Sequence, residues 1–431
     1  MSVSKSNIST RQGLLAISPI AVFLLIYLIT SIVIGDFYKM PLSVAMLIAS
    51  IWGAYTLKGL PLHDRIEVFS KEAGSSNVMY MIWIFILAGA FASIAKFTGA
   101  IEATVNITVS LLPSYLIVPG LFIATCLISM AIGTSVGTVV AMTPLAVEIA
   151  NNAGAPVPYY VAIVLGGAFF GDNLSFISDT TIAATRTQEC NMRDKFLANI
   201  WIVLPAALIA LFLYCINAPD ITIKIDTSNQ NTLLLIPYLI VIVSAIAGVN
   251  VIVVLFVGIL TAIAVGLLIG MNGLKLFSIA GEGIDSVGSL IIVTVLAAGM
   301  LGIIKKAGGI DYILKLLTNR LKSARGAQLS ILLLVGIVNI CTANNTVAII
   351  TVGSVARKIS VYFKLPPRRS ASLLDTGSCI VQALIPYGAQ TLMATSLAGI
   401  SPIAPWRFLF YPQILLLTLL LVILITKNHK K

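Results

Sequence analysis

Uncharged apolar runs, each long enough to cross a membrane, most constrain what this chain can fold into. Residues 14–34 and 408–426 are two such runs, and neither contains Lys, Arg, Asp or Glu. A helix needs roughly 20 residues to cross the hydrocarbon core of a bilayer. Charged residues make up only 10% of the 431 positions and apolar residues 58%, which excludes a soluble globular protein. The sequence therefore predicts an all-α polytopic membrane protein embedded in the lipid bilayer.

Ten of the apolar runs are interpreted as transmembrane helices. They lie near residues 14–34, 41–57, 78–96, 159–182, 196–216, 232–248, 250–270, 287–304, 371–395 and 407–426. Two further apolar stretches, 115–150 and 327–362, are interrupted by small polar residues, GTSVGT at 133–138 and CTANNT at 341–346. We expect both to form re-entrant hairpins. The first run lacks a cleavage site and a second span follows at once, so we expect a retained helix and not a signal peptide.

The net charge of +11 carries information about topology. Lys and Arg residues lie in short loops without interleaved aromatic tracts, so we expect no nucleic-acid partner. With a cytoplasmic N-terminus and hairpins that return to their own side, 22 of the 27 Lys and Arg residues lie inside, Lys195 among them. The five outside are Lys39, Lys96, Lys224, Lys275 and Arg407. The positive-inside rule thus predicts a multi-pass protein of the cell (plasma or inner) membrane with both termini in the cytoplasm.

An internal repeat is the strongest sign of organisation along the chain. Residues 87–102 match residues 296–311 at a constant offset of 209. One residue of slippage later, at an offset of 208, Thr134 meets Thr342. Chance similarity between apolar segments is common, but one offset that persists over about 90 residues indicates two copies of one structural unit.

In the predicted topology the two copies have opposite orientations in the membrane. The first repeat is 1–216, the extracytoplasmic linker 217–231 and the second, inverted repeat 232–431. Each copy also has an amphipathic stretch, 98–112 or 307–325, that we expect to lie flat at the membrane interface. Inverted repeats of this kind place substrate and ion sites where the two copies meet, near the middle of the bilayer.

The densest polar cluster within an apolar run is GDNLSFISDTT at residues 171–181. Such a run competes with helical hydrogen bonding, so we expect the helix over 159–182 to break there and expose backbone carbonyls and helix ends. Hard oxygen ligands suit Na⁺ or Li⁺. The candidate binding residues in this cluster are Asp172, Asn173, Ser175, Asp179 and Thr180.

Asp172 and Asp179 are the two carboxylates of this cluster and the predicted Na⁺ ligands. They are seven residues apart, so an intact helix stacks them on one face and a broken one brings them around a common cavity. Two carboxylates that share a buried site hold a proton more tightly than one alone, so proton and cation compete for the same oxygens. The alternative is that these acids cap the helix break or pair with Arg186.

The matching segment of the second copy is the predicted broken helix 371–395. Its only acid is Asp375, and Gln390 follows the helix-breaking residues of the PYGAQ segment at 386–390. Both are candidate binding residues, but Asp375 can instead pair with Arg368 or Arg369 near the cytoplasmic end. Because Val381 lies near and Tyr387 at the positions that correspond to Asp172 and Asp179, we expect an asymmetric site with its cation chemistry mainly in the first half.

The tips of the two predicted hairpins offer hydroxyls, amides and helix N-termini. These groups suit contacts to an ion or a carboxylate, and the alternative is close helix packing through small residues. The candidate binding residues at the tips are Thr134, Ser135, Thr138, Thr342, Asn344, Asn345 and Thr346.

Other chemistry finds little support in the sequence. The five cysteines are scattered without CxxC spacing, and no phosphate-binding loop or nucleophile triad occurs, so we expect neither an enzyme nor a cofactor. His63 lies in a basic segment and is expected to be solvated. Glu148, on the outer arm of the first hairpin, is expected to be structural or interfacial.

Three motifs resemble one known family. GTSVGT at 133–138, GAFFGDNLSFISDTT at 167–181 and PYGAQ at 386–390 look like the NhaC family of Na⁺/H⁺ antiporters, within the ion transporter superfamily. The resemblance covers nearly the whole chain. It implies a scaffold domain with a transport domain that moves like an elevator, and often a homodimer. Members of this family differ in substrate: some exchange organic acids such as malate and lactate, and others resemble amino-acid carriers.

Two transport functions follow as hypotheses. The first is Na⁺/H⁺ (or Li⁺/H⁺) exchange by alternating access, with Asp172 and Asp179 alternately holding protons and Na⁺. The second is Na⁺-coupled uptake or exchange of a small amino or organic acid, with Asn344, Asn345 and Thr346 helping to bind the solute. A channel is a third class, but the two hairpins are placed to interrupt a continuous pore.

Overall fold

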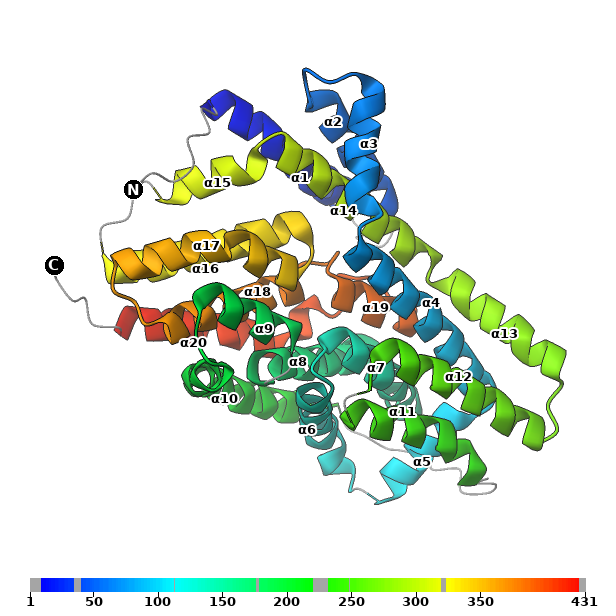
Figure 1. Ribbon diagram of the computed structural model, residues 1–431. Helices are drawn as coiled ribbons and strands as arrows, with labels where there is room; N and C mark the ends of the chain where they lie inside the picture. The colour runs from blue at the N-terminus through cyan, green and yellow to red at the C-terminus, as the bar shows by residue number, and fades with distance from the viewer. Residues whose placement is uncertain are drawn as a thin grey trace.

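A computed structural model describes residues 9–34, 40–111, 113–175, 178–219, 232–247, 249–318 and 323–425. All regular elements in these residues are helices, with no strand among them, so the predicted all-α class is confirmed (Figure 1). Seven helical stretches of the described part are long and apolar enough to cross a membrane, and four shorter apolar helices accompany them. The chain is an all-α polytopic membrane protein. Most of the predicted linker, residues 220–231, lies outside the described residues.

The helices follow the predicted apolar runs closely, since most of them end where Pro, Gly or a polar cluster interrupts a run. Those of the first part are α1 (Thr10–Ile34), α2 (Leu42–Thr56), α3 (Leu62–Ala73), α4 (Ser76–Phe97), α5 (Ala100–Leu111), α6 (Ser114–Ile132), α7 (Ser135–Asn152), α8 (Val157–Leu174), α9 (Asp179–Gln188) and α10 (Met192–Ile216). Those of the second part are η1 (Thr232–Leu235), α11 (Ile236–Ile246), α12 (Val251–Leu268), α13 (Gly273–Ser286), α14 (Gly288–Lys306), α15 (Gly309–Thr318), α16 (Ala324–Thr342), α17 (Asn345–Tyr362), α18 (Pro367–Leu384), α19 (Ala389–Ala398), η2 (Trp406–Phe408) and α20 (Phe410–Ile425).

Each of the two stretches predicted as hairpins turns through two residues between its two helices. Between α6 and α7, Gly133 has a φ of 72° and Thr134 a φ of −146°. Between α16 and α17, Ala343 has a φ of 48° and Asn344 a φ of −147°. In each turn a left-handed residue ends the first helix and an extended N-cap residue begins the next. The two stretches predicted as hairpins therefore turn with the same backbone pattern.

Two helical stretches are interrupted, one in each half of the chain. The first ends as α8 at Leu174 and resumes as α9 at Asp179, and the second ends as α18 at Leu384 and resumes as α19 at Ala389. An interruption frees the last carbonyls of one segment and the first N–H groups of the next from helical hydrogen bonds. These freed groups have to find other partners or bind a ligand.

The turns and interruptions correct the register predicted between the two copies. Gly133 and Ala343 are 210 residues apart, and so are Ser175 and Ile385, the first residues after α8 and α18. The predicted offset of 208 in this part of the chain is therefore wrong. The predicted offset aligned threonines of the first copy with threonines of the second. The structure instead aligns the residues at which the corresponding helices end. The resulting pairs are Asp172 with Gln382 rather than Val381, and Asp179 with Ala389 rather than Tyr387.

Helices α3 and α13 were not predicted, because both are too polar to read as membrane spans. Helix α3 packs on α14 and α13 packs on α4. Glycines permit the close approach: a Cβ atom at Gly89 would lie 2.3 Å from the carbonyl oxygen of Gly283, and one at Gly299 would lie 2.3 Å from the ring of Phe69. Small residues that let backbones approach are a common basis of helix packing in membranes.

Helices from the two halves of the chain cross-pack at the centre of the molecule. Helix α9 contacts α17, and α7 contacts α19, so the turn-linked pair of each half packs on the interrupted helix of the other half. Helices α10 and α20 also contact each other. In Figure 1 these helices lie together, with α1 to α4 and α11 to α14 above them and to their right. The two turns and the two interruptions therefore meet in the interior.

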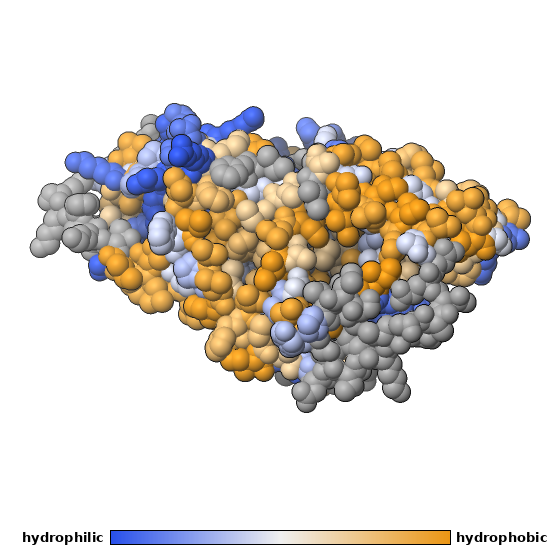
Figure 2. Space-filling model, turned by 90° about the horizontal axis from the view of Figure 1, so that it is seen from below, coloured by the Kyte–Doolittle hydropathy of each residue, from blue (hydrophilic) through white to orange (hydrophobic). Residues whose placement is uncertain are grey.

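The outer surface is strongly apolar. Trp201 is 80% exposed and Val33 78%, and many other large apolar side chains of α1, α2, α10 and α12 face outwards. Figure 2 shows apolar residues over most of one face, with hydrophilic residues gathered toward one edge. Exposed apolar area of this extent suits contact with lipid and not with water.

Candidate functional site

A cavity of about 90 Å³ lies where the two turns and the two interruptions meet. It is lined by the first residues of α7, α9, α17 and α19, the last residues of α8 and α18, and side chains of α4. We refer to it as the central cavity. Nine of the fourteen predicted binding residues line it: Thr134, Ser135, Asp172, Asp179, Thr180, Asn344, Asn345, Thr346 and Gln390.

Asp172 is the buried carboxylate of the central cavity. Its side chain, near the end of α8, accepts hydrogen bonds from the backbone N–H of Ser135 at 3.1 Å and from the hydroxyl of the same residue. Ser135 is the first residue of α7, so the carboxylate also faces the positive end of a helix dipole. Among the described residues, no basic side chain forms an ion pair with Asp172.

A chain of hydrogen bonds links Asp172 to the second half of the protein. The Gln390 amide donates to Ser135 Oγ at 2.9 Å. The Gln382 amide in turn donates to Gln390 Oε1 at 3.0 Å and to the carbonyl of Ala343 at 2.9 Å. The chain therefore runs from the end of α16 to the start of α7. Gln382 holds a helix C-terminus, whereas its counterpart Asp172 holds a helix N-terminus, so each side chain matches the polarity of the helix end that it contacts.

Asp179 is the exposed carboxylate of the same cavity. It is the first residue of α9, and both carboxylates line the central cavity, one buried and one exposed. The predicted alternative, a pair with Arg186, is not formed, because the ion pairs of the described residues involve other groups. The hydroxyls of Ser178 and Thr180 approach the carbonyl of Asp172, at 2.9 and 3.4 Å, and so hold the interruption together.

The tip of the second turn is ordered by its own side chains. Asn344 Oδ1 accepts from the N–H of Val347 at 2.9 Å and so caps α17. Thr342 donates to the carbonyl of Asn344 at 3.0 Å and lines a neighbouring cavity instead of the central one. Asn345 and Thr346 follow at the start of α17 and face the central cavity.

Three other predicted residues lie behind the cavity lining and bind the backbone. Asn173 donates to the carbonyl of Phe169 at 2.8 Å, Ser175 to that of Met130 at 2.9 Å, and Thr138 to that of Thr134 at 3.0 Å. These side chains support the fold of the site and do not face the cavity.

Asp375 lies in a second buried cluster, and its predicted alternative partners are wrong. Its carboxylate is 2.7 Å from Lys195 Nζ and accepts from Asn199 at 2.9 Å, and all three side chains are buried. Arg369 instead donates to Gln328 at 2.7 Å. Lys195, counted as a loop residue in the sequence, lies inside α10. The reason is that α10 starts earlier than its apolar run, so its first turn is packed against α18 and the interruption of the first half.

A larger cavity of about 300 Å³ adjoins the central one. It lies between α3, α4 and α14 on one side and α16, α17 and α19 on the other, and it shares Met81, Asn344 and Ala389 with the central cavity. Its lining includes an ion pair between Glu72 and Lys305, both partly exposed. We refer to this cavity as the vestibule.

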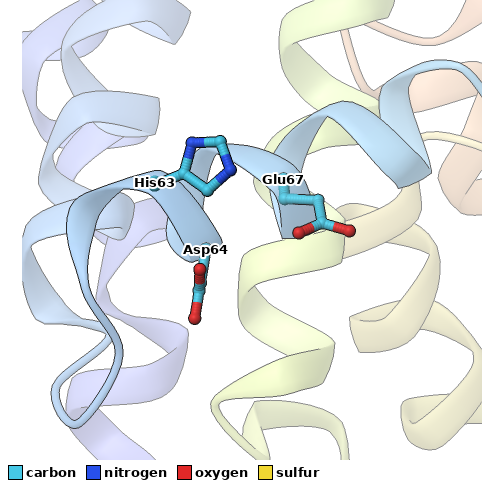
Figure 3. A group of neighbouring side chains, drawn as sticks. All are labelled: His63, Asp64 and Glu67. Atoms are coloured by element: carbon cyan, nitrogen blue, oxygen red, sulfur yellow. The ribbon is translucent and has the colours of Figure 1, made fainter.

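Within the described part of the chain, one group of side chains outside these cavities has metal-ligand composition. His63, Asp64 and Glu67 each offer a ligand atom within 4.8 Å of the others, all from α3 (Figure 3). His63 and Glu67 are exposed and Asp64 is partly so, as expected for a solvated charged turn. The predicted solvated state of His63 is therefore confirmed.

Comparison with known proteins identifies the family of this chain. The model of the Na⁺/H⁺ antiporter family matches residues 2–218 and 221–426. The chain belongs to this family. Family membership implies Na⁺ and H⁺ as transported ions, and together with the apolar helices it makes the chain a multi-pass membrane transporter. The resemblance noted in the sequence is thereby confirmed.

Similar proteins share this family. The Na⁺/H⁺ antiporter NhaC of Bacillus subtilis is 24% identical over 91% of this chain and 95% of its own length. The Na⁺/H⁺ antiporter NhaC of Alkalihalophilus pseudofirmus is 26% identical over 86% of both chains. The malate-2H⁺/Na⁺-lactate antiporter of Bacillus subtilis is 23% identical over 87% of both chains.

Sequence reasoning missed three polar residues of the interior of this antiporter-family protein. Lys195 and Asn199 lie four apart on α10, a spacing that places two polar side chains on one face of a largely apolar helix. That spacing could have identified both residues as polar groups of the interior, but Lys195 was counted among the charges of the cytoplasmic loops. Gln382 was missed because the predicted register placed the counterpart of Asp172 near the apolar residue Val381.

Proposed function

We propose that this protein exchanges Na⁺ (or Li⁺) for H⁺ by alternating access, with Asp172 as the group that both ions share. The observation that carries the proposal is a buried carboxylate without a basic partner among the described residues. A buried charge is costly unless another charge or a proton neutralises it. Asp172 therefore holds either a proton or a cation, and exchange follows from their competition.

The central cavity has the size and the ligands for a small cation. A volume of about 90 Å³ is that of about three water molecules, since each occupies about 30 Å³ in the liquid. Oxygen atoms of Asp172, Asp179, Ser135, Thr180 and Asn344 are available along its lining. We propose that Na⁺ binds between the two carboxylates, with the exposed Asp179 at the entrance and the buried Asp172 as the inner ligand.

The hydrogen-bond chain gives the second half a role in exchange. Ser135 Oγ lies between the Asp172 carboxylate and the Gln390 amide. When Asp172 takes up a proton, it becomes a donor and the hydroxyl of Ser135 has to reorient. We propose that this reorientation lets Gln390 and Gln382 on the second half respond to the state of Asp172.

The proposal includes the inverted arrangement of two repeats, 1–216 and 232–431, joined through 217–231. The matched turns, the matched interruptions and the cross-packing of α9 with α17 and α7 with α19 support it. We also propose cytoplasmic termini in the plasma membrane, since 21 Lys and Arg residues against 5 still favour this topology when the buried Lys195 is left out. A homodimer remains a prediction.

The vestibule favours a second candidate, Na⁺-coupled exchange of a small organic acid. Its volume of about 300 Å³ admits such a solute, and Lys305 and Asn344 offer donors for a carboxylate. A relative of this chain is named a malate-2H⁺/Na⁺-lactate antiporter. In this candidate Na⁺ still binds at Asp172, and the solute occupies the adjoining vestibule.

Everted vesicles with a pH-sensitive dye test the two candidates. Na⁺ or Li⁺ added without organic solute moves protons in the wild type, and Asp172→Asn abolishes this movement. Asp64→Asn, a change of a carboxylate on α3 outside both cavities, leaves the response intact. Wild-type vesicles that respond only when an organic acid is present would favour the second candidate and contradict the first.

A further inference from the structure

The ammonium group of Lys195 is held by three oxygen atoms in the interior. It donates to the carbonyl of Asn173 at 2.8 Å and to Thr181 Oγ1 at 2.7 Å, and it lies 2.7 Å from Asp375 Oδ2. An ammonium group has three donors, so its capacity is filled. The whole Lys195 residue is 0% exposed.

The three oxygens have the character of a cation site. One is a backbone carbonyl in the last turn of α8, where carbonyls lack intrahelical partners and the helix dipole favours positive charge. One is a hydroxyl of α9 and one a carboxylate of α18. Carbonyl, hydroxyl and carboxylate oxygens are the ligands that hard cations take.

The surroundings add a further oxygen atom, and no other ion pair of the described residues involves this cluster. Asn199 donates to both the Asn173 carbonyl and Asp375 Oδ2, at 2.8 and 2.9 Å, which fixes the positions of these two oxygens. Its own Oδ1 is buried and accepts no hydrogen bond from any described residue. Every ion pair of the described residues other than the one with Lys195 lies at partly exposed groups. The oxygen frame is therefore supported independently of the ammonium.

We propose that this frame is a second monovalent-cation site and that Lys195 occupies it as a tethered cation. Among the residues that the structure describes, a free cation site then lies at the central cavity, and the chain itself keeps a second site filled. Removal of the side chain beyond Cβ leaves the carbonyl, the hydroxyl and the carboxylate around an open space. A free Na⁺ ion enters that space and takes the place of the ammonium.

The experiment compares full-length variants purified in detergent. All of them carry Asp172→Asn, which removes Na⁺ binding at the central cavity. Thermal unfolding is followed as choline is replaced by Na⁺ at constant ionic strength. Asp172→Asn alone shows no Na⁺-dependent rise of Tm. Asp172→Asn with Lys195→Ala regains a rise of Tm with Na⁺ concentration, as expected when an ion binds only the folded state.

Two matched variants control for space and charge. Lys195→Met removes the charge but fills the space, so its protein is destabilised in choline and Na⁺ gives no rescue. Lys195→Ala with Asp375→Asn removes the carboxylate, so the Na⁺-dependent rise is lost. Equal Na⁺ responses of the Ala and Met variants, or no response of the Ala variant, overturn the proposal.

Recovery of the protein supplies a second readout. If the Lys195→Ala variant is too unstable to purify in choline, its yield in Na⁺ rises several-fold, and equally poor yields in both salts overturn the proposal. A Na⁺ response that survives in Asp172→Asn alone contradicts the proposed exchange site instead. The two proposals therefore fail in different variants.

Discussion

At the scale of single residues, two buried aspartates of this protein differ in their partners. Asp375 has a lysine partner 2.7 Å away, whereas Asp172 has a serine and a helix N-terminus but no basic partner among the described residues. The sequence predicted a basic partner for Asp375 as one alternative, but it indicated Arg368 or Arg369 and not Lys195. What separates the two aspartates is the position of Lys195, which depends on where α10 starts and on how it packs against α18.

Lys195→Met tests how much the buried ion pair of Lys195 and Asp375 contributes to stability. Removing one partner leaves Asp375 buried and uncompensated, so we expect a loss of roughly 3–5 kcal/mol of stability. The partly exposed pair of Lys305 and Glu72 provides the control, since Lys305→Met removes at most about 1 kcal/mol. Denaturation midpoints of the purified variants measure both, and equal losses would show that burial of the first pair is unimportant.

Ser135→Ala tests the hydroxyl between Asp172 and Gln390. The variant keeps the backbone N–H but loses the side-chain hydrogen bond to the carboxylate, so we expect Na⁺ affinity to fall roughly 5- to 30-fold, the equivalent of about 1–2 kcal/mol. Thr143→Val removes a buried hydroxyl of the same helix that accepts and donates no hydrogen bond among the described residues, and it leaves the affinity unchanged. Isothermal titration with NaCl gives both values.

At the scale of elements, most helices could be predicted from the sequence and two could not. Apolar runs and their breakers locate the ends of α4, α12 and α20 to within a few residues. Helices α3 and α13 were not predicted, because their composition is polar and because only their packing against α14 and α4 shows which faces are buried. The predicted register between the two halves was also wrong. It depends on which residue of each turn adopts a left-handed conformation, and the Thr and Gly content does not specify that residue.

We expect opposite effects on stability when a methyl group is added at Gly133 and when one is removed at Ala343. Gly133 and Ala343 both have positive φ, a conformation that costs residues with a Cβ atom roughly 1–2 kcal/mol. Gly133→Ala therefore lowers the unfolding midpoint, whereas Ala343→Gly raises it or leaves it unchanged. Thermal unfolding of the purified variants measures this, and a loss of stability in Ala343→Gly would contradict the assigned turn geometry.

At the scale of the whole molecule, the account depends on two halves that approach the same cavity from opposite sides. The all-α class, the family and the membrane location could be predicted from the sequence, since apolar run length and three motifs specify them. A site where the two copies meet was predicted too, but which nine of the candidate residues line it was not, because that arises from the cross-packing of α9 with α17 and of α7 with α19. Hydrogen bonds across these contacts, from Gln188 to Gly353 and from Gln390 to Ser135, join residues 165 and 255 positions apart.

Accessibility labelling tests the predicted orientation. In a protein without native cysteines, a cysteine at Lys224, a position outside the described residues, reacts with an impermeant reagent added to intact cells. A cysteine at Lys364, an exposed position after α17, reacts only when the reagent reaches the cytoplasmic side. Labelling of both positions from the same side would refute the inverted arrangement.

Competition between Na⁺ and H⁺ for Asp172 is the central claim, and Na⁺ affinity as a function of pH tests it most directly. Each bound Na⁺ displaces a proton in the acidic range, so we expect the apparent affinity of the purified protein to fall by up to about tenfold for each unit that the pH is lowered. Protons are released into a weakly buffered solution when Na⁺ is added, and Asp172→Asn releases none. A Na⁺ affinity that stays constant with pH, without proton release, would contradict the account.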